Sequence, residues 1–261
     1  MHIIIPARYA SSRLPGKPLL DVAGKTLIER VYDCARASGA EHVIVATDDE
    51  RIRAAVEAFG GTVCMTSAAH ASGTDRIAEA IAQLRLAPET VVVNLQGDEP
   101  LMPPALIRQV AETLLAHPDA AMVTACHPLH DPESLASPDV VKVVRDARGY
   151  ALYFSRAPIP WPRERMAGRG AEPIAADRHI GIYAYRAGFV TRYAAWPPCP
   201  LERAEFLEQL RALWHGERIA VCEAASLPGA GVDTPDDLER VRLYFREKSK
   251  EKSKQYLFST Y

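Results

Sequence analysis

Cysteine is scarce in this sequence and follows no recognisable pattern. The five cysteines among 261 residues are widely separated, and no two of them have the CxxC spacing of a zinc knuckle or redox pair. An odd, scattered set also argues against the disulfide framework of a small secreted domain. We therefore predict neither a zinc-bound nor a disulfide-stabilised scaffold, and we expect a reducing compartment.

Long apolar runs and an excess of one charge are also missing. Apolar stretches such as Val91–Val93 fall far short of the ~20 residues that span a bilayer. The N-terminal segment has neither the basic region nor the small-residue cleavage site of a secretory signal. The net charge of −2, from 31 Lys and Arg against 33 Asp and Glu, argues against broad electrostatic binding of nucleic acid or an anionic membrane. These absences predict a cytoplasmic protein with no nucleic-acid partner and no membrane insertion.

What remains is the composition of a globular protein, with 48% apolar and 25% charged residues. In the first half, strand-like and helix-like segments alternate, which is typical of βαβ units on a largely parallel sheet. Thr26 and either Asp48 or Asp49 are expected to cap two of the helices. The predicted strands are His2–Ile5 (stopped by Pro6), His42–Ala46, Thr62–Met65 and Val91–Leu95. The predicted helices are Leu27–Ala37, Glu50–Phe59, Asp75–Leu86 and Pro104–Ala116.

The pattern changes after Ala121. A hairpin is predicted there, followed by a strand, two helices, a further strand and a last helix. In the second helix, Leu207, Leu210 and Trp214 are expected to share one face because of their three- and four-residue spacing. These elements are Val140–Val144 with Tyr150–Ser155, His179–Tyr185, Ala187–Trp196, Leu201–Trp214, Arg218–Cys222 and Asp236–Arg246.

These elements predict one α/β catalytic domain over residues 1–245, with an antiparallel excursion at about 120–185. Residues 246–261 form a separate basic extension, with five Lys or Arg and two Glu. Alternating Lys, Ser and Glu are typical of either a solvated helix or a disordered tail. We expect the chemistry at the loops that follow the strands, where strand carboxyl ends and helix N-termini converge.

A basic loop follows the first strand. Ile5–Pro18 places Arg8, Arg13 and Lys17 among small residues, glycine and proline. Arginine binds two oxygens at once and lysine supplies a point charge, so this loop suits a polyphosphate. It contains neither the GxxxxGK[ST] of a P-loop nor the GxGxxG of a dinucleotide turn. A solvated surface loop with incidental charges is the alternative.

Two acidic loops are candidate metal sites. Asp98 and Glu99 come directly after the Val91–Leu95 strand, where hard oxygen ligands commonly hold Mg²⁺ that also binds substrate phosphates. Capping of the next helix is the other explanation for that pair. Asp233 follows a glycine-bracketed turn and is a possible second ligand, whereas Asp236 and Asp237 are explained by the dipole of the last helix. The spacing alone does not choose between these possibilities.

A series of distinctive segments runs in order along the chain: PARYASSRLPGKPL, ATDDERI, SGTDR, NLQGDEP, YALYFSRAPIPW, HIGIYAYR, LEQLR and GVDTPDDLERVR. Together they extend from about Ile3 to Arg242. In these segments the sequence resembles the 3-deoxy-manno-octulosonate (Kdo) cytidylyltransferase family, also called CMP-Kdo synthetases. So many collinear matches are far more specific than any single motif.

The resemblance implies a fold and an activity. The fold is a three-layer α/β/α sandwich with a mixed, mostly parallel sheet, the GT-A-like fold of nucleotide-diphospho-sugar transferases. The implied reaction transfers CMP from CTP to the anomeric hydroxyl of Kdo with Mg²⁺ as cofactor, releases pyrophosphate and serves lipopolysaccharide synthesis. A cytoplasmic homodimer is also implied, with the 120–185 lobe as its expected interface.

The resemblance also assigns residues to roles. Arg8, Arg13 and Lys17 would bind the CTP phosphates, and Asp98 and Asp233 would hold Mg²⁺; Arg13, Lys17, Asp98 and Asp233 are the expected catalytic set. The residues expected around the nucleotide are Ser72, Gly73, Asp75 and Arg76. Those expected around the sugar are Gln96, Arg156, His179, Tyr183, Glu208 and Gln209. Arg163, Arg165 or Arg169, in a loop rich in proline, glycine and arginine, could reach substrate on closure.

Three other functions compete with this one. A related activating enzyme would use another acid sugar, such as a sialate or an 8-amino Kdo analogue. A GT-A glycosyltransferase usually carries a DxD metal motif, whereas this chain has Asp98-Glu99-Pro100. A non-catalytic nucleotide-binding module would have no need to retain both Asp98 and Asp233.

Overall fold

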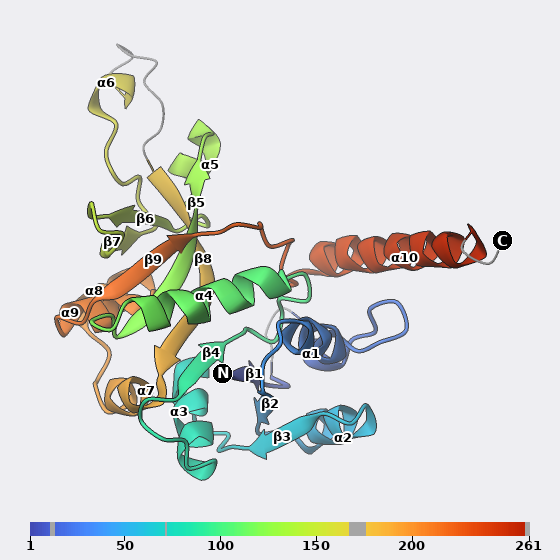
Figure 1. Cartoon of the computed structure of the whole chain (residues 1–261). Helices are drawn as coiled ribbons and strands as arrows, with labels where there is room; N and C mark the ends of the chain where they lie inside the picture. The colour runs from blue at the N-terminus through green and yellow to red at the C-terminus, as the bar shows by residue number, and fades with distance from the viewer. Residues whose placement is uncertain (11–13, 71, 167–175, 259–261) are drawn as a thin grey trace.

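The middle layer of the structure is a mixed sheet with helices on both sides (Figure 1). The computed structural model describes residues 1–10, 14–70, 72–166 and 176–258, with the side chains of all of these except 165–166 and 252–258. The strands are β1 (His2–Ala7), β2 (His42–Thr47), β3 (Thr62–Met65), β4 (Val91–Asn94), β5 (Met122–Leu129), β6 (Lys142–Arg145), β7 (Ala151–Ser155), β8 (Ala176–Arg186) and β9 (Ile219–Glu223). The helices are the 3₁₀ helix η1 (Lys17–Leu19), α1 (Leu27–Ala37), α2 (Glu50–Ala58), α3 (Gly73–Gln83), α4 (Pro104–Ala116), α5 (Pro132–Ala136), α6 (Arg163–Met166), α7 (Ala187–Ala194), α8 (Pro200–Glu205), α9 (Gln209–Trp214) and α10 (Pro235–Phe258).

The strand order is β3-β2-β1-β4-β8-β5-β9, and β6 joins β8 and β7 off this path. Strands β3, β2, β1 and β4 are parallel neighbours, as the alternation of strands and helices predicted. Strand β8 runs antiparallel between β4 and β5, and β9 is parallel to β5. The sheet is therefore mixed, and the expected antiparallel excursion begins where β8 enters it.

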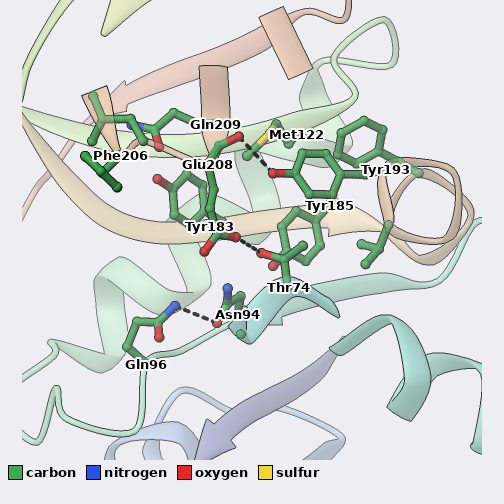
Figure 2. A pocket seen from close by; sticks show the side chains of 14 residues that line it. Thr74, Asn94, Gln96, Met122, Tyr183, Tyr185, Tyr193, Phe206, Glu208 and Gln209 are labelled. Atoms are coloured by element: carbon green, nitrogen blue, oxygen red, sulfur yellow. Dashed lines mark hydrogen bonds between the residues drawn. The ribbon is translucent and has the colours of Figure 1, made fainter. Parts of the chain in front are cut away.

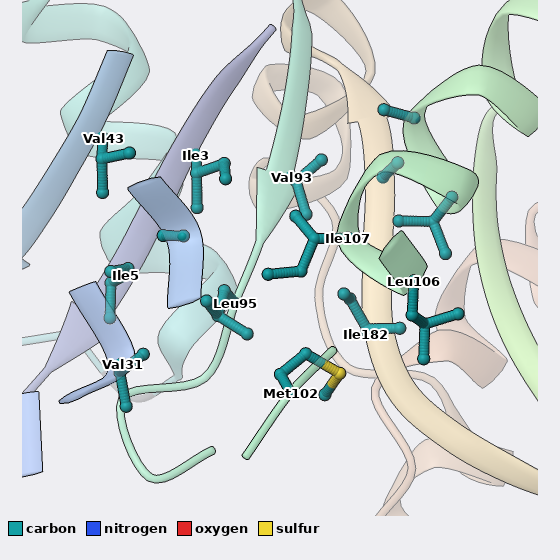
Figure 3. Packing of buried hydrophobic residues seen from close by; sticks show 14 of the residues in the cluster. Ile3, Ile5, Val31, Val43, Val93, Leu95, Met102, Leu106, Ile107 and Ile182 are labelled. Carbon is teal, nitrogen blue, oxygen red and sulfur yellow. The ribbon is translucent and has the colours of Figure 1, made fainter. Parts of the chain in front are cut away.

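Each strand of the parallel half contributes apolar side chains to both faces of the sheet. Ile3 and Ile5 pack on the face covered by α1, α2 and α4, whereas Ile4 packs on the face covered by α3, α7 and α9. Figure 3 shows the first of these layers, in which Leu106 and Ile107 of α4 meet side chains of the sheet. Strands buried on both faces read as continuous apolar runs, as these do. The predicted three-layer sandwich is confirmed.

Side-chain caps begin several helices where the sequence indicated them. The Thr26 hydroxyl accepts a hydrogen bond from the Glu29 amide at 3.3 Å, and the Asp49 carboxylate accepts one from the Arg51 amide at 2.9 Å. Helix α3 starts at Gly73, earlier than predicted, because the Ser72 hydroxyl accepts from the Asp75 amide at 3.1 Å.

Two predictions about strands need correction. Strand β1 was expected to stop before Pro6, but it continues to Ala7. Its pairing with β4 ends at Ile4, opposite Asn94, so the missing amide of Pro6 breaks no hydrogen bond of that ladder. No element was predicted at Met122–Leu129, yet β5 lies between β8 and β9. The predicted hairpin is confirmed as β6 and β7, which pair antiparallel.

The predicted helix Leu201–Trp214 is wrong, because the chain forms two helices there. Helix α8 ends at Glu205. The next residue, Phe206, has a left-handed backbone with φ 54° and ψ 45°, and α9 begins at Gln209. Because of this break, Trp214 does not share a buried face with Leu207 and Leu210 as predicted. Leu207 and Leu210 are buried, but the side chain of Trp214 is 53% exposed.

Helix α10 starts at Pro235 and continues past Arg246 to Phe258 (Figure 1). Its first turns pack on the loop after β1 through a small apolar cluster that includes Leu14, Val22, Val232 and Leu238. This cluster joins the loop after β1 to the start of the last helix, while the rest of α10 extends away from the body of the molecule (Figure 1). In the part of the chain that the structure describes, no helix is both long and apolar enough to cross a membrane.

Candidate active site

Two adjoining cavities lie at the carboxyl ends of β1 and β4. We call the first the charged cavity; it is lined by Pro6, Ala7, Arg8, Lys17, Pro18, His70, Ser72, Gly73, Arg76, Gln96, Gly97, Asp98, Glu208 and Asp233. The second, the aromatic cavity, is lined by Gly73, Thr74, Asn94, Gln96, Met122, Tyr183, Tyr185, Phe189, Val190, Tyr193, Phe206, Leu207, Glu208 and Gln209. Gly73, Gln96 and Glu208 line both, so a ligand in one cavity would meet a ligand in the other there.

Lys17 is the centre of the charged cavity. Its ammonium donates to Asp98 Oδ2 at 2.6 Å, to Asp233 Oδ1 at 3.2 Å and to the Val232 carbonyl at 2.8 Å. Lys17 begins η1, Asp98 follows β4, and Asp233 precedes α10. The apolar cluster between the first loop and α10 holds these three segments together. The structure thus unites three of the predicted catalytic residues, although more than 200 positions separate Lys17 from Asp233.

Glu99 follows Asp98 directly in the loop after β4. Burial and the neighbouring charges of Asp98 and Asp233 raise the pKa of its carboxyl to about 8.

Gly97 allows the loop after β4 to pack closely on β1, since a Cβ at this position would lie 2.9 Å from the Pro6 carbonyl oxygen. The loop after β4 can therefore lie directly against the end of β1, which places Asp98 over the cavity.

The donor set fits Mg²⁺. The carboxylates of Asp98 and Asp233 and the Val232 carbonyl all accept hydrogen bonds from the Lys17 ammonium. All three groups present the hard oxygen atoms that Mg²⁺ prefers. Among the described residues, no group of three or more His, Cys, Asp or Glu side chains is arranged to hold a metal by itself. A magnesium ion with two protein carboxylates would complete its shell with water and substrate phosphate, as Mg²⁺ commonly does.

Most of the expected nucleotide residues lie at the charged cavity, but not all of them. Arg8, Ser72, Gly73 and Arg76 line the charged cavity, whereas Asp75 is not among its lining residues. Arg8 is exposed and available to a polyphosphate. Arg13 lies outside the described residues.

Arg76 and Ser72 also have structural roles. The buried Arg76 guanidinium donates to Thr66 Oγ1 at 2.5 Å and pairs with Asp48 at 3.4 Å. Ser72 caps α3, as described above. His70, which the sequence did not indicate, also lines the charged cavity and pairs with Glu79.

The aromatic cavity combines ring side chains with a few polar groups (Figure 2). The Thr74 hydroxyl donates to Glu208 Oε2 at 2.7 Å, and the Tyr193 hydroxyl donates to the Glu208 carbonyl at 2.8 Å. Burial raises the pKa of the Glu208 carboxyl. Gln96 donates to Asn94 Oδ1 at 3.1 Å on the opposite wall. Gln96, Tyr183, Glu208 and Gln209, four of the expected sugar residues, line this one cavity.

The other two expected sugar residues lie elsewhere. The Arg156 guanidinium donates to the backbone carbonyls of Glu205 at 2.7 Å and Pro138 at 2.9 Å. His179 is bonded through Nε2 to Thr124 Oγ1 at 2.9 Å, and its ring packs on Tyr183. Burial lowers the pKa of His179 to about 3, so its imidazole is neutral at pH 7.

The loop arginines are not brought to either cavity where they are described. Arg163 is exposed at the start of α6. Arg169 and the side chain of Arg165 lie outside the described part of the structure.

Sequence reasoning missed several lining residues of the aromatic cavity. Thr74 and Asn94 are inside the quoted motifs SGTDR and NLQGDEP, so their position was a usable signal. Tyr185 is likewise inside the motif HIGIYAYR. Phe189 and Tyr193 gave no signal, because aromatic side chains on amphipathic helices are by default core residues.

A family model described as Cytidylyltransferase matches residues 2–219. The chain belongs to the cytidylyltransferase family. This cytidylyltransferase is 58% identical to a 3-deoxy-manno-octulosonate cytidylyltransferase from Idiomarina loihiensis. The match extends over 243 residues, which are 92% of this chain and 96% of the relative. The resemblance identified from the sequence motifs is confirmed.

Solved structures agree with this family. The cytidylyltransferase superposes on a CMP:2-keto-3-deoxy-manno-octonic acid synthetase complexed with CTP, with a TM-score of 0.86, 43% identity and coverage of 94% of this chain and 98% of the other. A nucleotidyl transferase from Methanothermobacter has a TM-score of 0.61 at 16% identity, covering 95% and 98% of the two chains, and shares the fold.

Proposed function

We propose that this chain transfers CMP from CTP to the anomeric hydroxyl of 3-deoxy-D-manno-octulosonate and releases pyrophosphate. The observation that carries the proposal is the pair of adjoining cavities. One presents Arg8 and Lys17 beside two carboxylates, and the other presents four polar residues expected of a Kdo site. The 58% identity to a 3-deoxy-manno-octulosonate cytidylyltransferase supports this substrate pair.

The main obstacle in this reaction is charge. CTP carries about four negative charges, and the attacking sugar acid is itself an anion, so the two repel as the acceptor hydroxyl approaches the α-phosphate. Arg8 and Lys17 would place fixed positive charge beside the phosphates. Mg²⁺ held by Asp98 and Asp233 would neutralise further phosphate charge and make a bound hydroxyl more acidic.

The junction of the cavities would orient the acceptor. Gln96 and Glu208 line both cavities, so they can position a sugar hydroxyl toward the nucleotide. The bond from Thr74 holds the Glu208 carboxylate in place, and the bond from Tyr193 holds its backbone. Fixing both reactants in one geometry supplies much of the rate enhancement expected of a nucleotidyltransferase.

Three further properties belong to the same proposal: Mg²⁺ as cofactor, a homodimer and a cytoplasmic location. The oxygen donor set at Lys17 supports the first. The resemblance to the Kdo cytidylyltransferase family supports the other two.

The test is pyrophosphate release by purified protein with CTP, Mg²⁺ and one acid sugar at a time. We expect release with Kdo, loss of activity on chelation, and recovery with excess Mg²⁺. Release with a sialate or 8-amino analogue but not with Kdo would contradict the proposed acceptor. Absence of release with every acid sugar tested would favour the non-catalytic module.

Replacing Lys17 with alanine is expected to raise the KM for CTP by about 10- to 100-fold, because one charge-assisted contact to phosphate is lost. The KM for the sugar should change little. Lys25→Ala is the matched control, since Lys25 pairs with Glu29 and Asp33 and lines neither cavity. The measurement is the steady-state rate of pyrophosphate release at subsaturating CTP for the two variants and wild type. An unchanged rate for Lys17→Ala would contradict phosphate binding by Lys17.

A further inference from the structure

Phe206 has an unusual environment for a large aromatic residue. Its side chain is 82% exposed, the highest value among the exposed large apolar residues of the described chain. Its backbone is in the left-handed region at φ 54°, which is sterically unfavourable for a residue with a Cβ. The ring therefore gains little from burial within the protein itself.

The neighbouring segments hold Phe206 in place. Before it, α8 is anchored by Glu205, whose carboxylate accepts from Ser155 Oγ at 2.7 Å and from the Arg156 amide at 2.8 Å. After it, Leu207 is buried in the core. The left-handed turn between these anchors directs the chain from α8 into α9, and it presents the ring at a defined place.

That place is the edge of the aromatic cavity. Phe206 lines this cavity and directly precedes Leu207, Glu208 and Gln209, which line it too. Figure 2 shows Phe206 beside Gln209 and across the cavity from Tyr193. Since Phe206 is 82% exposed, its ring is available to a ligand at the edge of this cavity.

A second observation indicates that a polar ligand belongs in this cavity. Gln209 is 95% buried, and its Nε2 has no hydrogen-bond partner among the described residues. A buried amide donor without a partner costs free energy, and a ligand oxygen would satisfy it. Gln209 and Phe206 line the same wall, one polar and one apolar.

We propose that Phe206 is a further substrate-contact residue whose ring covers the mouth of the aromatic cavity and packs on the carbon skeleton of the bound acid sugar. The inference rests on the proposed function, because it takes this cavity as the sugar site. A sugar presents carbon-bound hydrogens on one face, and these pack favourably on the electron-rich face of an aromatic ring. Polar contacts from Gln209 and Glu208 would hold the hydroxyls.

Phe206→Asn and Phe206→Tyr test this inference together. Asparagine tolerates the left-handed backbone, so it removes the ring without imposing a new conformational cost. We expect Phe206→Asn to raise the KM for the sugar roughly tenfold, with the KM for CTP and the thermal midpoint nearly unchanged. Phe206→Tyr keeps the ring and should retain a sugar KM within about twofold of wild type.

Arg85→Asn is the matched control, since Arg85 is an exposed residue with φ 53° that lines neither cavity. It should leave both KM values unchanged. A sugar KM that is unaffected by Phe206→Asn would overturn the inference. If the kinetics are unchanged but the variant no longer elutes as a dimer in size-exclusion chromatography, the ring belongs to a subunit contact instead. Failure of the proposed function is distinct, because wild type would then show no activity with Kdo at all.

Discussion

Replacing Asp98 with asparagine is expected to abolish nucleotidyl transfer, lowering kcat by at least ~10³-fold. Asp98 is one of the two carboxylates that converge on the Lys17 ammonium, at 2.6 Å, and it would be a direct ligand of Mg²⁺. Asparagine has nearly the same shape but carries no charge, so the site would bind the metal weakly and lose compensation of phosphate charge. Pyrophosphate release at saturating CTP, sugar and Mg²⁺ is the measurement.

Asp236→Asn is the control for this variant. Asp236 is an exposed carboxylate in the first turn of α10, three positions after Asp233, and it lines neither cavity. Its loss should leave kcat within about twofold of wild type. The thermal midpoint of Asp98→Asn should stay close to wild type, because the amide oxygen still accepts from Lys17. Near-normal turnover in a folded Asp98→Asn protein would show that Asp98 does not bind the metal.

Replacing Arg211 with methionine is expected to destabilise the fold by about 3–5 kcal/mol, the usual cost of leaving one charge of a buried pair alone. The Arg211 guanidinium donates to the two Glu202 oxygens at 2.7 and 2.5 Å and to the Trp196 carbonyl at 3.1 Å. The two side chains of the pair are 6% and 10% exposed. Urea denaturation followed by circular dichroism gives the change in unfolding free energy.

The double variant Glu202→Leu/Arg211→Met separates charge from packing. Removing both charges together should recover most of the lost stability, since a buried ion pair is commonly replaceable by apolar groups of similar size. Arg192→Met is the control, because Arg192 pairs with Glu217 at the surface, where loss of an ion pair costs about 0–1 kcal/mol. A cost for Arg211→Met as small as that of Arg192→Met would refute the buried-charge explanation.

The buried pair also connects stability with the site. Arg211 lies over the ring of Tyr193 at 4.5 Å, and the Tyr193 hydroxyl bonds the Glu208 backbone. The motif LEQLR therefore serves two purposes. Glu208 and Gln209 face the aromatic cavity, while Arg211 secures the short helix α9 that carries Gln209 and follows Glu208.

Most of the parallel half was predictable because its signals are local. Apolar runs mark strands buried on both faces, and Thr26 and Asp49 cap helices through their nearest backbone amides. Strand β5 was missed because its length and position depend on pairing with β8 and β9, which lie far away in the sequence. The break at Phe206 was missed for a related reason: periodicity describes one continuous helix and does not detect a left-handed residue held by distant contacts.

By itself, the sequence determined the α/β class, the residue types of an anion and metal site, and, through its collinear motifs, the cytidylyltransferase family. Only the tertiary structure decided which of the named residues meet. It unites Lys17 with Asp98 and Asp233 and gathers Gln96, Tyr183, Glu208 and Gln209 around one cavity, while it ties the Arg156 guanidinium to backbone carbonyls. The physical reason is that residue type and local spacing fix chemistry and helix or strand periodicity, whereas proximity across 200 positions is set by packing, here by the cluster of Leu14, Val22, Val232 and Leu238.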